Sequence, residues 1–442
     1  MTASDSKLAC VVMAAGLGTR MHSNMPKHLH PLLGRRLVDW AIAAGASVDP
    51  DPLVVVTSPE LANAFDGGAV AMQEQPLGTG DAIGVARAAV GSADRLLVLP
   101  GDHPLLTEEL MAKLLATHSR EQAAATVLSF SPADPRAYGR IVRAADGRLE
   151  AIVEATDATD EQLAIGEVNA SIYVFETAKL WPALERLQPV NAQGELYLTD
   201  AIRFLVEDGE KVAIYEAPDA RVVDGVNTRA ELAAAGSVLR ERINEAHMLA
   251  GVTIVDPSST WIEAEVELDS DTTVHPFTVL GGRTRVGSGA EIGPHAVVVD
   301  ADIGAGALVG PFCYVRPGTI VESGAKVGTF VEIKNSRIGA RTKVPHLSYV
   351  GDAEIGEDTN VAAGNITANF SHQPNRPKGR TTIGRNVRTG VDNTFVAPVD
   401  IGDDAWIYPG TVITDDVPPG SLAGFPPRQQ TKEGYVYRKR DS

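Results

Sequence analysis

Two cationic side chains follow a glycine turn near the start of the chain. The stretch CVVMAAGLGTRMHSNMPKHL passes from apolar residues into Gly16 and Gly18 and then presents Arg20 and Lys27. A turn after a strand directs backbone N–H groups at phosphate oxygens, and two cations can neutralise a triphosphate from two sides. The turn is not a dinucleotide fingerprint, because Met21 replaces its third glycine. The pattern predicts phosphate binding, with a plain strand-to-helix turn as the alternative.

Polar residues further along the chain fit the same chemistry. QEQPLGTGDA begins with Gln73 and contains a second glycine loop, which could read the edge of a base. Asp102 follows an apolar run, where a bare carboxylate is costly unless it binds a cation. Asn227, in VDGVNT, offers a second oxygen. One carboxylate and one amide suit Mg²⁺, which keeps waters and takes further ligands from phosphates.

The first half of the chain must position these residues on a sheet. Short apolar runs such as PLVVVTS and DRLLVLPGD alternate with helix-like stretches such as GDAIGVARAAV. This alternation is typical of βα units around a mostly parallel sheet. The sequence therefore predicts an α/β (Rossmann-like) domain over residues 1–229, followed by a linker helix over residues 230–250.

The second half, residues 251–442, has a different period. Units such as IGPHAV, IGAGAL, VESGAK and IGARTK open with an aliphatic residue every six positions and then carry small or turn-forming residues. This repeat predicts a left-handed parallel β-helix with three flat faces, whereas a β-sandwich would alternate with period two. The polar segment 367–381 breaks the period and predicts a loop leaving one corner.

Composition excludes several classes of partner. The formal net charge is -18, so no concentrated basic face is expected for nucleic acid or an anionic membrane. No apolar run is long enough to cross a bilayer, and the first residues lack the order of a secretory signal, so we expect a cytoplasmic protein. Two distant cysteines, Cys10 and Cys313, exclude a disulfide framework.

The motifs taken together resemble those of the GlmU family, the bifunctional N-acetylglucosamine-1-phosphate uridyltransferases and glucosamine-1-phosphate acetyltransferases, particularly of actinobacterial type. The similarity is carried by MAAGLGTRM, MPKHLHPLLGR, PLGTG, PGDHPLL, YGRIVR, IVEATDATDEQ, NAQGELYLTD, VDGVNTR, GPFCYVRPG, FVEIKNS, KVPHLSYVGDAEIG and FVAPV. Their order and spacing extend over the whole chain.

For the first domain the resemblance implies transfer of UMP from UTP to N-acetylglucosamine 1-phosphate, giving UDP-N-acetylglucosamine and pyrophosphate. Arg20 and Lys27 would act catalytically by neutralising charge during in-line attack, with Mg²⁺ on Asp102 and Asn227. The positions that match UTP-binding residues are Ala14, Ala15, Gly16, Gly18, Lys27, Gln73, Gly78 and Thr79. The positions that match sugar-phosphate contacts are Gly139, Glu154, Asn169 and Asn227.

For the second domain the resemblance implies acetylation of glucosamine 1-phosphate by acetyl-CoA. The amine must lose a proton, and His346 matches the family's general base. The positions implied to hold the acceptor are Arg316, Lys334, Tyr349 and Asn360. The positions implied to support the histidine or face acetyl-CoA are Glu332, Asn369, Phe370 and Val391. A homotrimer is implied, because the family builds these sites between neighbouring prisms, and the product would serve cell-wall peptidoglycan synthesis.

Several residues depart from the family pattern. On the acetyl-CoA side, Phe370 replaces a usual tyrosine and Val391 a usual serine, and Tyr408 stands at a usually small position. Pro426 falls where an arginine near the CoA phosphates often lies. In the first domain Ser171 adds a hydroxymethyl group near the expected place of the sugar's acyl group.

These departures keep other functions open. The chain could be a nucleotidyltransferase for a different sugar 1-phosphate, with a β-helix altered to another acyl donor or reduced to a trimer scaffold. A non-catalytic oligomeric binding protein is a third reading. It is disfavoured because the phosphate-binding cations and both metal-ligand positions are intact. The loop within segment 367–381 leaves Lys378 as the counterpart of a further family lysine.

Overall fold

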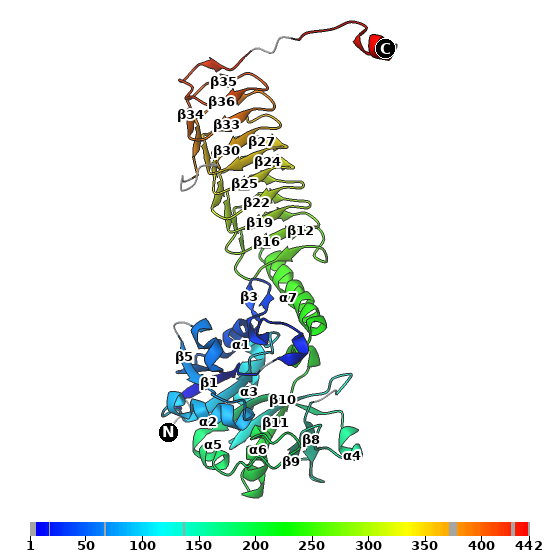
Figure 1. Cartoon of the computed structure of the whole chain (residues 1–442). Coiled ribbons are helices and arrows are strands. Elements are labelled where there is room, and N and C mark those ends of the chain that lie inside the picture. Colours follow the sequence, from blue (N-terminus) through cyan, green and yellow to red (C-terminus); the bar gives the residue numbers. More distant parts are fainter. Residues whose placement is uncertain are drawn as a thin grey trace. The chain divides into compact units, whose positions relative to one another are not determined.

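The computed structural model describes residues 6–16, 18–65, 68–135, 138–370, 378–425 and 429–440. The chain divides into two compact units, Met1–Val238 and Leu239–Ser442. The division falls within helix α7 (Arg229–Leu249), which is labelled in Figure 1. Among the described residues, no helix combines the length and the apolar character needed to span a bilayer.

The first unit is built on one mixed, mostly parallel sheet. The strand order is β11-β7-β10-β6-β1-β4-β5, and only β10 runs antiparallel to its neighbours in this order. The strands are β1 (Leu8–Met13), β4 (Leu53–Thr57), β5 (Ala69–Met72), β6 (Arg95–Pro100), β7 (Ala125–Phe130), β10 (Val168–Glu176) and β11 (Val212–Glu216). The ribbon of β8 (Arg140–Arg143) and β9 (Leu149–Val153) extends from β10, and β2 (Pro31–Leu32) pairs with β3 (Arg35–Arg36).

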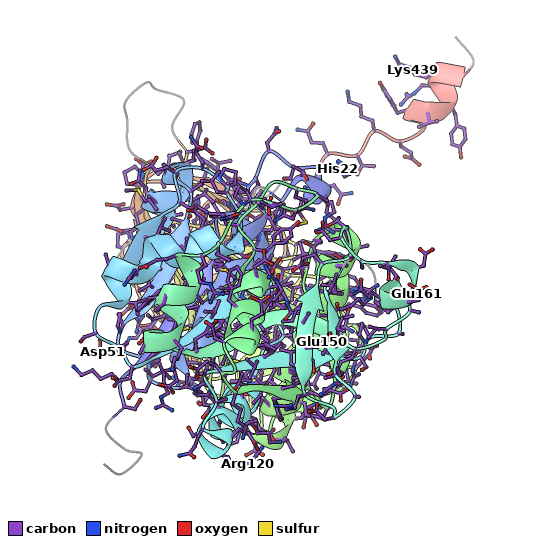
Figure 2. All side chains as sticks on the ribbon, turned by 90° about the horizontal axis from the view of Figure 1, so that it is seen from below. His22, Asp51, Arg120, Glu150, Glu161 and Lys439 are labelled. Carbon is purple, nitrogen blue, oxygen red and sulfur yellow. The ribbon has the colours of Figure 1, made fainter. Side chains whose placement is uncertain are left out.

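Helices cover both faces of this sheet, which explains why its strands read as continuous apolar runs. In β1, Ala9 and Val11 belong to one buried cluster, whereas Cys10 and Val12 belong to the other. The first cluster includes residues of α2 (Thr79–Val90), α5 (Thr177–Leu184) and α6 (Leu198–Glu207); the second includes residues of α1 (Leu37–Ala46) and α3 (Glu108–Glu121). The shorter helices are η1 (Thr19–Met21), η2 (Lys27–Leu29), η3 (Pro59–Ala64), α4 (Asp160–Leu163) and η4 (Ala220–Val223). Charged side chains such as Arg120 and Glu161 lie at the outer edge of the view in Figure 2 and are exposed.

The second unit is a parallel β-helix, and the fold class predicted for both halves is confirmed. Each strand pairs in parallel with one from the next coil, so the strands stack into three flat faces (Figure 1). The first face comprises β12 (Thr253–Ile254), β15 (Thr273–Val274), β18 (Glu291–Ile292), β21 (Leu308–Val309), β24 (Lys326–Thr329) and β27 (Lys343–His346), and its line continues through β32 (Arg388–Thr389), β35 (Trp406–Ile407) and β37 (Leu422–Ala423).

The other two faces have the same construction. The second face comprises β13 (Trp261–Ile262), β16 (Val279–Gly281), β19 (Val297–Val299), β22 (Tyr314–Val315), β25 (Glu332–Lys334), β28 (Tyr349–Gly351), β30 (Ile366–Ala368), β33 (Thr394–Val396) and β36 (Val412–Ile413). The third comprises β14 (Glu267–Leu268), β17 (Arg285–Val286), β20 (Ala301–Ile303), β23 (Thr319–Val321), β26 (Arg337–Ile338), β29 (Ala353–Ile355), β31 (Thr381–Ile383) and β34 (Val399–Ile401). A short helix, α8 (Tyr435–Arg440), lies near the carboxyl end.

The six-residue period produces this stacking directly. Thr253 pairs with Thr273, Thr273 with Glu291 and Glu291 with Leu308, so successive coils take close to three six-residue units. The aliphatic residue of each unit points inward, as Val274, Ile292 and Val309 do in the continuous buried core. The coil that joins Ala353 to its partner Thr381 is longer, and residues 371–377 of its predicted loop lie outside the described part of the chain. Pro426 also lies outside it.

Candidate functional site

A cavity of about 420 Å³ opens at the carboxyl ends of β1 and β6. Its lining includes Met13 and Pro100, the last residues of these strands, and this edge of an open α/β sheet is where ligands usually bind. The cavity brings together these residues predicted from the sequence: Ala15, Gly16, Gly18, Arg20, Lys27, Gln73, Gly78, Thr79, Asp102 and Asn227. Ala14 is fully buried and does not line the cavity.

The centre of the cavity is a cluster of opposite charges. The Nζ atom of Lys27 donates to Asp102 Oδ2 and also donates to Asn227 Oδ1 over 2.7 Å. Arg20 Nη2 donates to the same Asn227 oxygen over 2.9 Å. Burial alone would raise the pKa of Asp102, but Lys27 and His103 hold it well below its ordinary value. Two oxygens from distant parts of the chain therefore converge on one positive charge.

Two glycines allow the chain to pass close to this cluster. Gly18 has φ of 62°, and a Cβ there would lie 2.3 Å from the Cβ of Lys27. Gly78 has φ of 115°, and a Cβ there would lie 2.6 Å from the carbonyl oxygen of Leu196. Both positions lie in a region of φ that residues with a side chain rarely adopt. These glycines are therefore required for the close approach of Lys27 and for the start of α2.

Gln73 presents one polar atom for a ligand. Its buried side-chain amide nitrogen donates to the carbonyl oxygen of Gly78 over 3.0 Å and to Asp81 Oδ2 over 2.8 Å. Both amide protons are thereby used within the protein, and the amide oxygen is left as the acceptor. An acceptor at this point matches an imide N–H, such as that of uracil, and not a bare ring nitrogen.

A second cavity, of about 210 Å³, adjoins the first. Glu154 lines it, whereas Asn169 and Gly139 support its wall: the Asn169 N–H donates to the Gly139 carbonyl over 2.8 Å, and its side chain donates to Tyr173 Oη over 2.6 Å. Burial raises the pKa of Glu154, and nearby carboxylates add to this effect. Met13, Thr79, Ser171 and Glu195 line both cavities. The polar lining and the shared wall suit a sugar placed next to phosphates.

Ser171 projects from an irregular part of β10. The register of β10 against β7 shifts between Asn169 and Tyr173, and Ser171 has φ of 58°. The Ser171 N–H donates to Asn169 Oδ1 over 3.1 Å. Left-handed backbone in a residue other than glycine costs about 1 to 3 kcal/mol and concentrates at functional sites. The bulge places Ser171 on the wall that separates the two cavities.

On the β-helix, cations gather on the second face. Arg316 donates to Glu332 Oε1 over 2.8 Å, and Lys334 lies two residues further along β25. Lys378 lies beside Lys334, and its proximity, together with Arg316, lowers the pKa of Lys334. Tyr349 pairs with Glu332 in the neighbouring coil. A cluster of like charges that lowers a lysine pKa is suited to binding an anion.

His346 lies at the end of β27, on the first face, close to the corner that leads to Tyr349. It is exposed, and Asn360 forms backbone bridges with Lys343 and Arg388 on the same face. Within the described residues of one chain, the His346 ring bonds no side chain. Glu332 and Asn369, which the resemblance implies as its supports, bond elsewhere: Glu332 accepts from Arg316, and Asn369 donates to Asp352 Oδ2 over 2.5 Å.

The implied acetyl-CoA side is open to solvent in the single chain. Phe370 is 67% exposed and Val391 is 46% exposed, while Tyr408 is half-buried.

Two histidines in the first cavity received no role from the sequence. His28 and His103 are 4% and 5% exposed, and both line the cavity. The His28 Nδ1 and His103 Nε2 atoms are buried without a hydrogen-bond partner among the described residues. For His103, the sequence signal that could have revealed a role is its position directly after Asp102 in PGDHPLL, where the carboxylate can accept a hydrogen bond from the imidazole.

Comparison with known proteins covers both units. Residues 10–207 match the family model described as a MobA-like NTP transferase domain. The chain is 46% identical to the bifunctional protein GlmU of Mycolicibacterium gilvum over 467 residues, which covers 98% of this chain and 93% of that protein. It is also 46% identical to the bifunctional protein GlmU of Mycobacterium marinum, with the same shares covered. The bifunctional protein GlmU of Mycolicibacterium paratuberculosis matches at 46% identity over 99% of this chain and 94% of its own.

Proposed function

The chain belongs to the GlmU family of bifunctional proteins, and on this basis we propose how its two units perform two reactions. The β-helix transfers an acetyl group from acetyl-CoA to glucosamine 1-phosphate. The first unit then transfers UMP from UTP to the N-acetylated product and releases pyrophosphate. The observation that carries this conclusion is 46% identity over 98% of the chain, which includes the whole β-helix. The comparisons give no support to a different sugar phosphate or to a β-helix that serves only as a scaffold.

The first unit contributes positioning and charge neutralisation. Backbone N–H groups of Gly16 and Gly18, together with Arg20 and Lys27, face the triphosphate, and the sugar of the acceptor occupies the second cavity beside Glu154. Such preorganised charge lowers the barrier of phosphoryl transfer without covalent catalysis. Gln73 accepts a hydrogen bond from the base, which selects uracil.

The residues present also fit Mg²⁺. Asp102 Oδ2 and Asn227 Oδ1 already converge on one cation, the Lys27 ammonium, and two oxygen ligands suit an ion that keeps waters. When bound, Mg²⁺ supplies positive charge to the phosphates. We assign Asp102 and Asn227 as its ligands, and Lys27 then has its Nζ free to bond a phosphate oxygen.

In the β-helix, His346 acts as the base that removes a proton from the attacking amine. Arg316, Lys334 and Lys378 provide the cations that hold the phosphate of the acceptor, as their clustering suggests. The His346 ring bonds no side chain among the described residues, and we propose that substrate or a neighbouring chain orients it.

An exposed aromatic column supports a homotrimer. Phe277, His295, Phe312 and Phe330 occupy the same corner of successive coils, with ring centroids 4.8, 4.7 and 5.6 Å apart. Phe277, Phe312 and Phe330 are 56%, 47% and 59% exposed. A contiguous exposed apolar surface is typical of an interface between subunits. Leu347, next to His346, is 62% exposed, which places the proposed base beside exposed apolar surface.

Paired substitutions test the assignment. Asp102→Ala should abolish pyrophosphate release from UTP and N-acetylglucosamine 1-phosphate while leaving the release of CoA thiol from acetyl-CoA and glucosamine 1-phosphate unchanged. His346→Ala should give the opposite result. Loss of both activities in either folded variant, or no loss in the expected one, would contradict the assignment of one reaction to each unit.

A further inference from the structure

His103 contacts the carboxylate of Asp102 on the side away from Lys27. The His103 Nδ1 and Asp102 Oδ1 atoms are 2.7 Å apart, whereas Oδ2 bonds the Lys27 ammonium. The carboxylate is ionised beside this ammonium and can only accept hydrogen bonds. His103 therefore donates through Nδ1–H, and each oxygen of Asp102 has its own partner.

The ring of His103 is also held from its far side. It is 5% exposed, and a Cβ on Gly225 would lie 2.8 Å from its Cε1 atom and 3.3 Å from its Nε2 atom. Gly225 precedes Asn227 by two residues, and the Val226 N–H donates to the backbone oxygen of Asp102 over 2.9 Å. The imidazole thus packs between Asp102, two residues after β6, and the loop that carries Asn227.

This placement fixes which way the carboxylate points. Without a donor on Oδ1, the Asp102 side chain could rotate and exchange its two oxygens. With Nδ1–H in place, Oδ2 is directed to the point that it shares with Asn227 Oδ1, which lies 2.7 Å from Lys27 Nζ. A site with only two protein ligands depends strongly on their orientation, and groups that orient ligands typically affect metal affinity by about 10- to 100-fold.

We propose that His103 is a positioning residue for uridylyl transfer: it orients Asp102, and through Gly225 the loop of Asn227, so that both oxygens meet at one divalent cation. The proposal rests on the function proposed above, in which these two residues hold Mg²⁺. It requires only the hydrogen bond from Nδ1–H to Asp102 Oδ1.

Direct metal binding tests this role without relying on turnover. The affinity of the full-length protein for UTP is measured by titration calorimetry, first in the absence of metal and then with saturating Mn²⁺. The ratio of these two affinities reports the contribution of the metal to UTP binding. His103→Leu should weaken binding of the Mn²⁺–UTP complex by about 10-fold or more, with binding of metal-free UTP unchanged within about twofold. His103→Asn keeps a nitrogen one bond from Cγ, where Nδ1 lies, and should bind the complex within about threefold of the wild-type affinity.

Further variants separate the possible outcomes. His103→Gln moves the amide toward the position of Nε2 and should weaken binding as His103→Leu does. The glutamine variant therefore provides the same test if the leucine variant does not fold. Release of CoA thiol by the β-helix serves as the folding control. The positioning role is wrong if Asp102→Ala loses the increase in UTP affinity that Mn²⁺ gives while His103→Leu keeps it. It is also wrong if His103→Asn and His103→Leu weaken binding of the Mn²⁺–UTP complex equally. In both cases the proposed function stands. If Asp102→Ala also keeps the increase in UTP affinity that Mn²⁺ gives, the assignment of Asp102 as a metal ligand is itself wrong.

Discussion

Gly18→Ala should disable uridylyl transfer by moving Lys27, although no functional side chain is removed. The new Cβ would lie 2.3 Å from Lys27 Cβ and 3.2 Å from its Cδ atom. Ordinary carbon contacts are about 3.5 to 4.0 Å, so Lys27 must retreat by roughly 1 Å. Displacement of a positioning group by about 1 Å can cost about 100-fold in rate. The left-handed backbone at φ of 62° adds about 1 to 2 kcal/mol of destabilisation, which a folded domain tolerates.

The assay measures both reactions on one preparation. We expect kcat/KM for pyrophosphate release to fall about 100-fold in Gly18→Ala, with release of CoA thiol unchanged. Gly84→Ala is the matched control: it lies within α2, nothing lies within 4 Å of its added Cβ, and replacing a helical glycine by alanine stabilises by about 1 kcal/mol. Uridylyl transfer within threefold of wild type in Gly18→Ala would refute the argument that Lys27 must lie against this glycine.

Three further outcomes follow from the structure. Ser171→Gly should relieve the left-handed backbone and open space where Ser171 now separates the two cavities. The kcat/KM of sugar phosphates with an N-acyl group larger than acetyl should then rise relative to that of the N-acetyl sugar, with KM for UTP unchanged in the pyrophosphate assay. Lys378→Met should raise KM for glucosamine 1-phosphate in acetyl transfer by about 10-fold or more, because it removes one charged partner of a phosphate. Burial lowers the pKa of His118, so below about pH 6.5 the unfolded chain binds a proton that the folded chain does not, and stability falls as the pH falls. His118→Gln should therefore show a shallower loss of melting temperature between about pH 6.5 and pH 5 than the wild type.

The sequence predicted the architecture where one physical pattern dominates. The six-residue period favours one kind of stacking, and the aliphatic residues that open its units, such as Ile292, Ile303 and Val321, lie inside the β-helix. The alternation of apolar runs with helix-like stretches in the first half predicted βα units around a mostly parallel sheet. The reversed direction of β10 was not predicted, because a buried antiparallel strand and a buried parallel strand have the same apolar composition. The bulge that presents Ser171 depends on register against β7, which composition does not contain.

The residues of the first cavity were predictable by type, but their partners were not. Lys27 and Asn227 are 200 positions apart, and only the folded sheet brings the ammonium between Asn227 and Asp102. The contribution of His103 was missed for the same reason, since its ring is held by Gly225, far along the chain. A motif indicates which chemistry is present, whereas the direction of each hydrogen bond depends on contacts between loops.

The two sites differ in what one chain supplies. In the first unit the cations, the carboxylate and the amide converge within a single cavity. In the β-helix the implied supports of His346 are occupied: Glu332 bonds Arg316, and Asn369 bonds Asp352. The described part of one chain therefore presents the proposed base and a cationic cluster without a side-chain partner that orients His346. The exposed aromatic column near this base gives a physical reason for a second copy to complete the site, so acetyl transfer should depend on assembly in a way that uridylyl transfer does not.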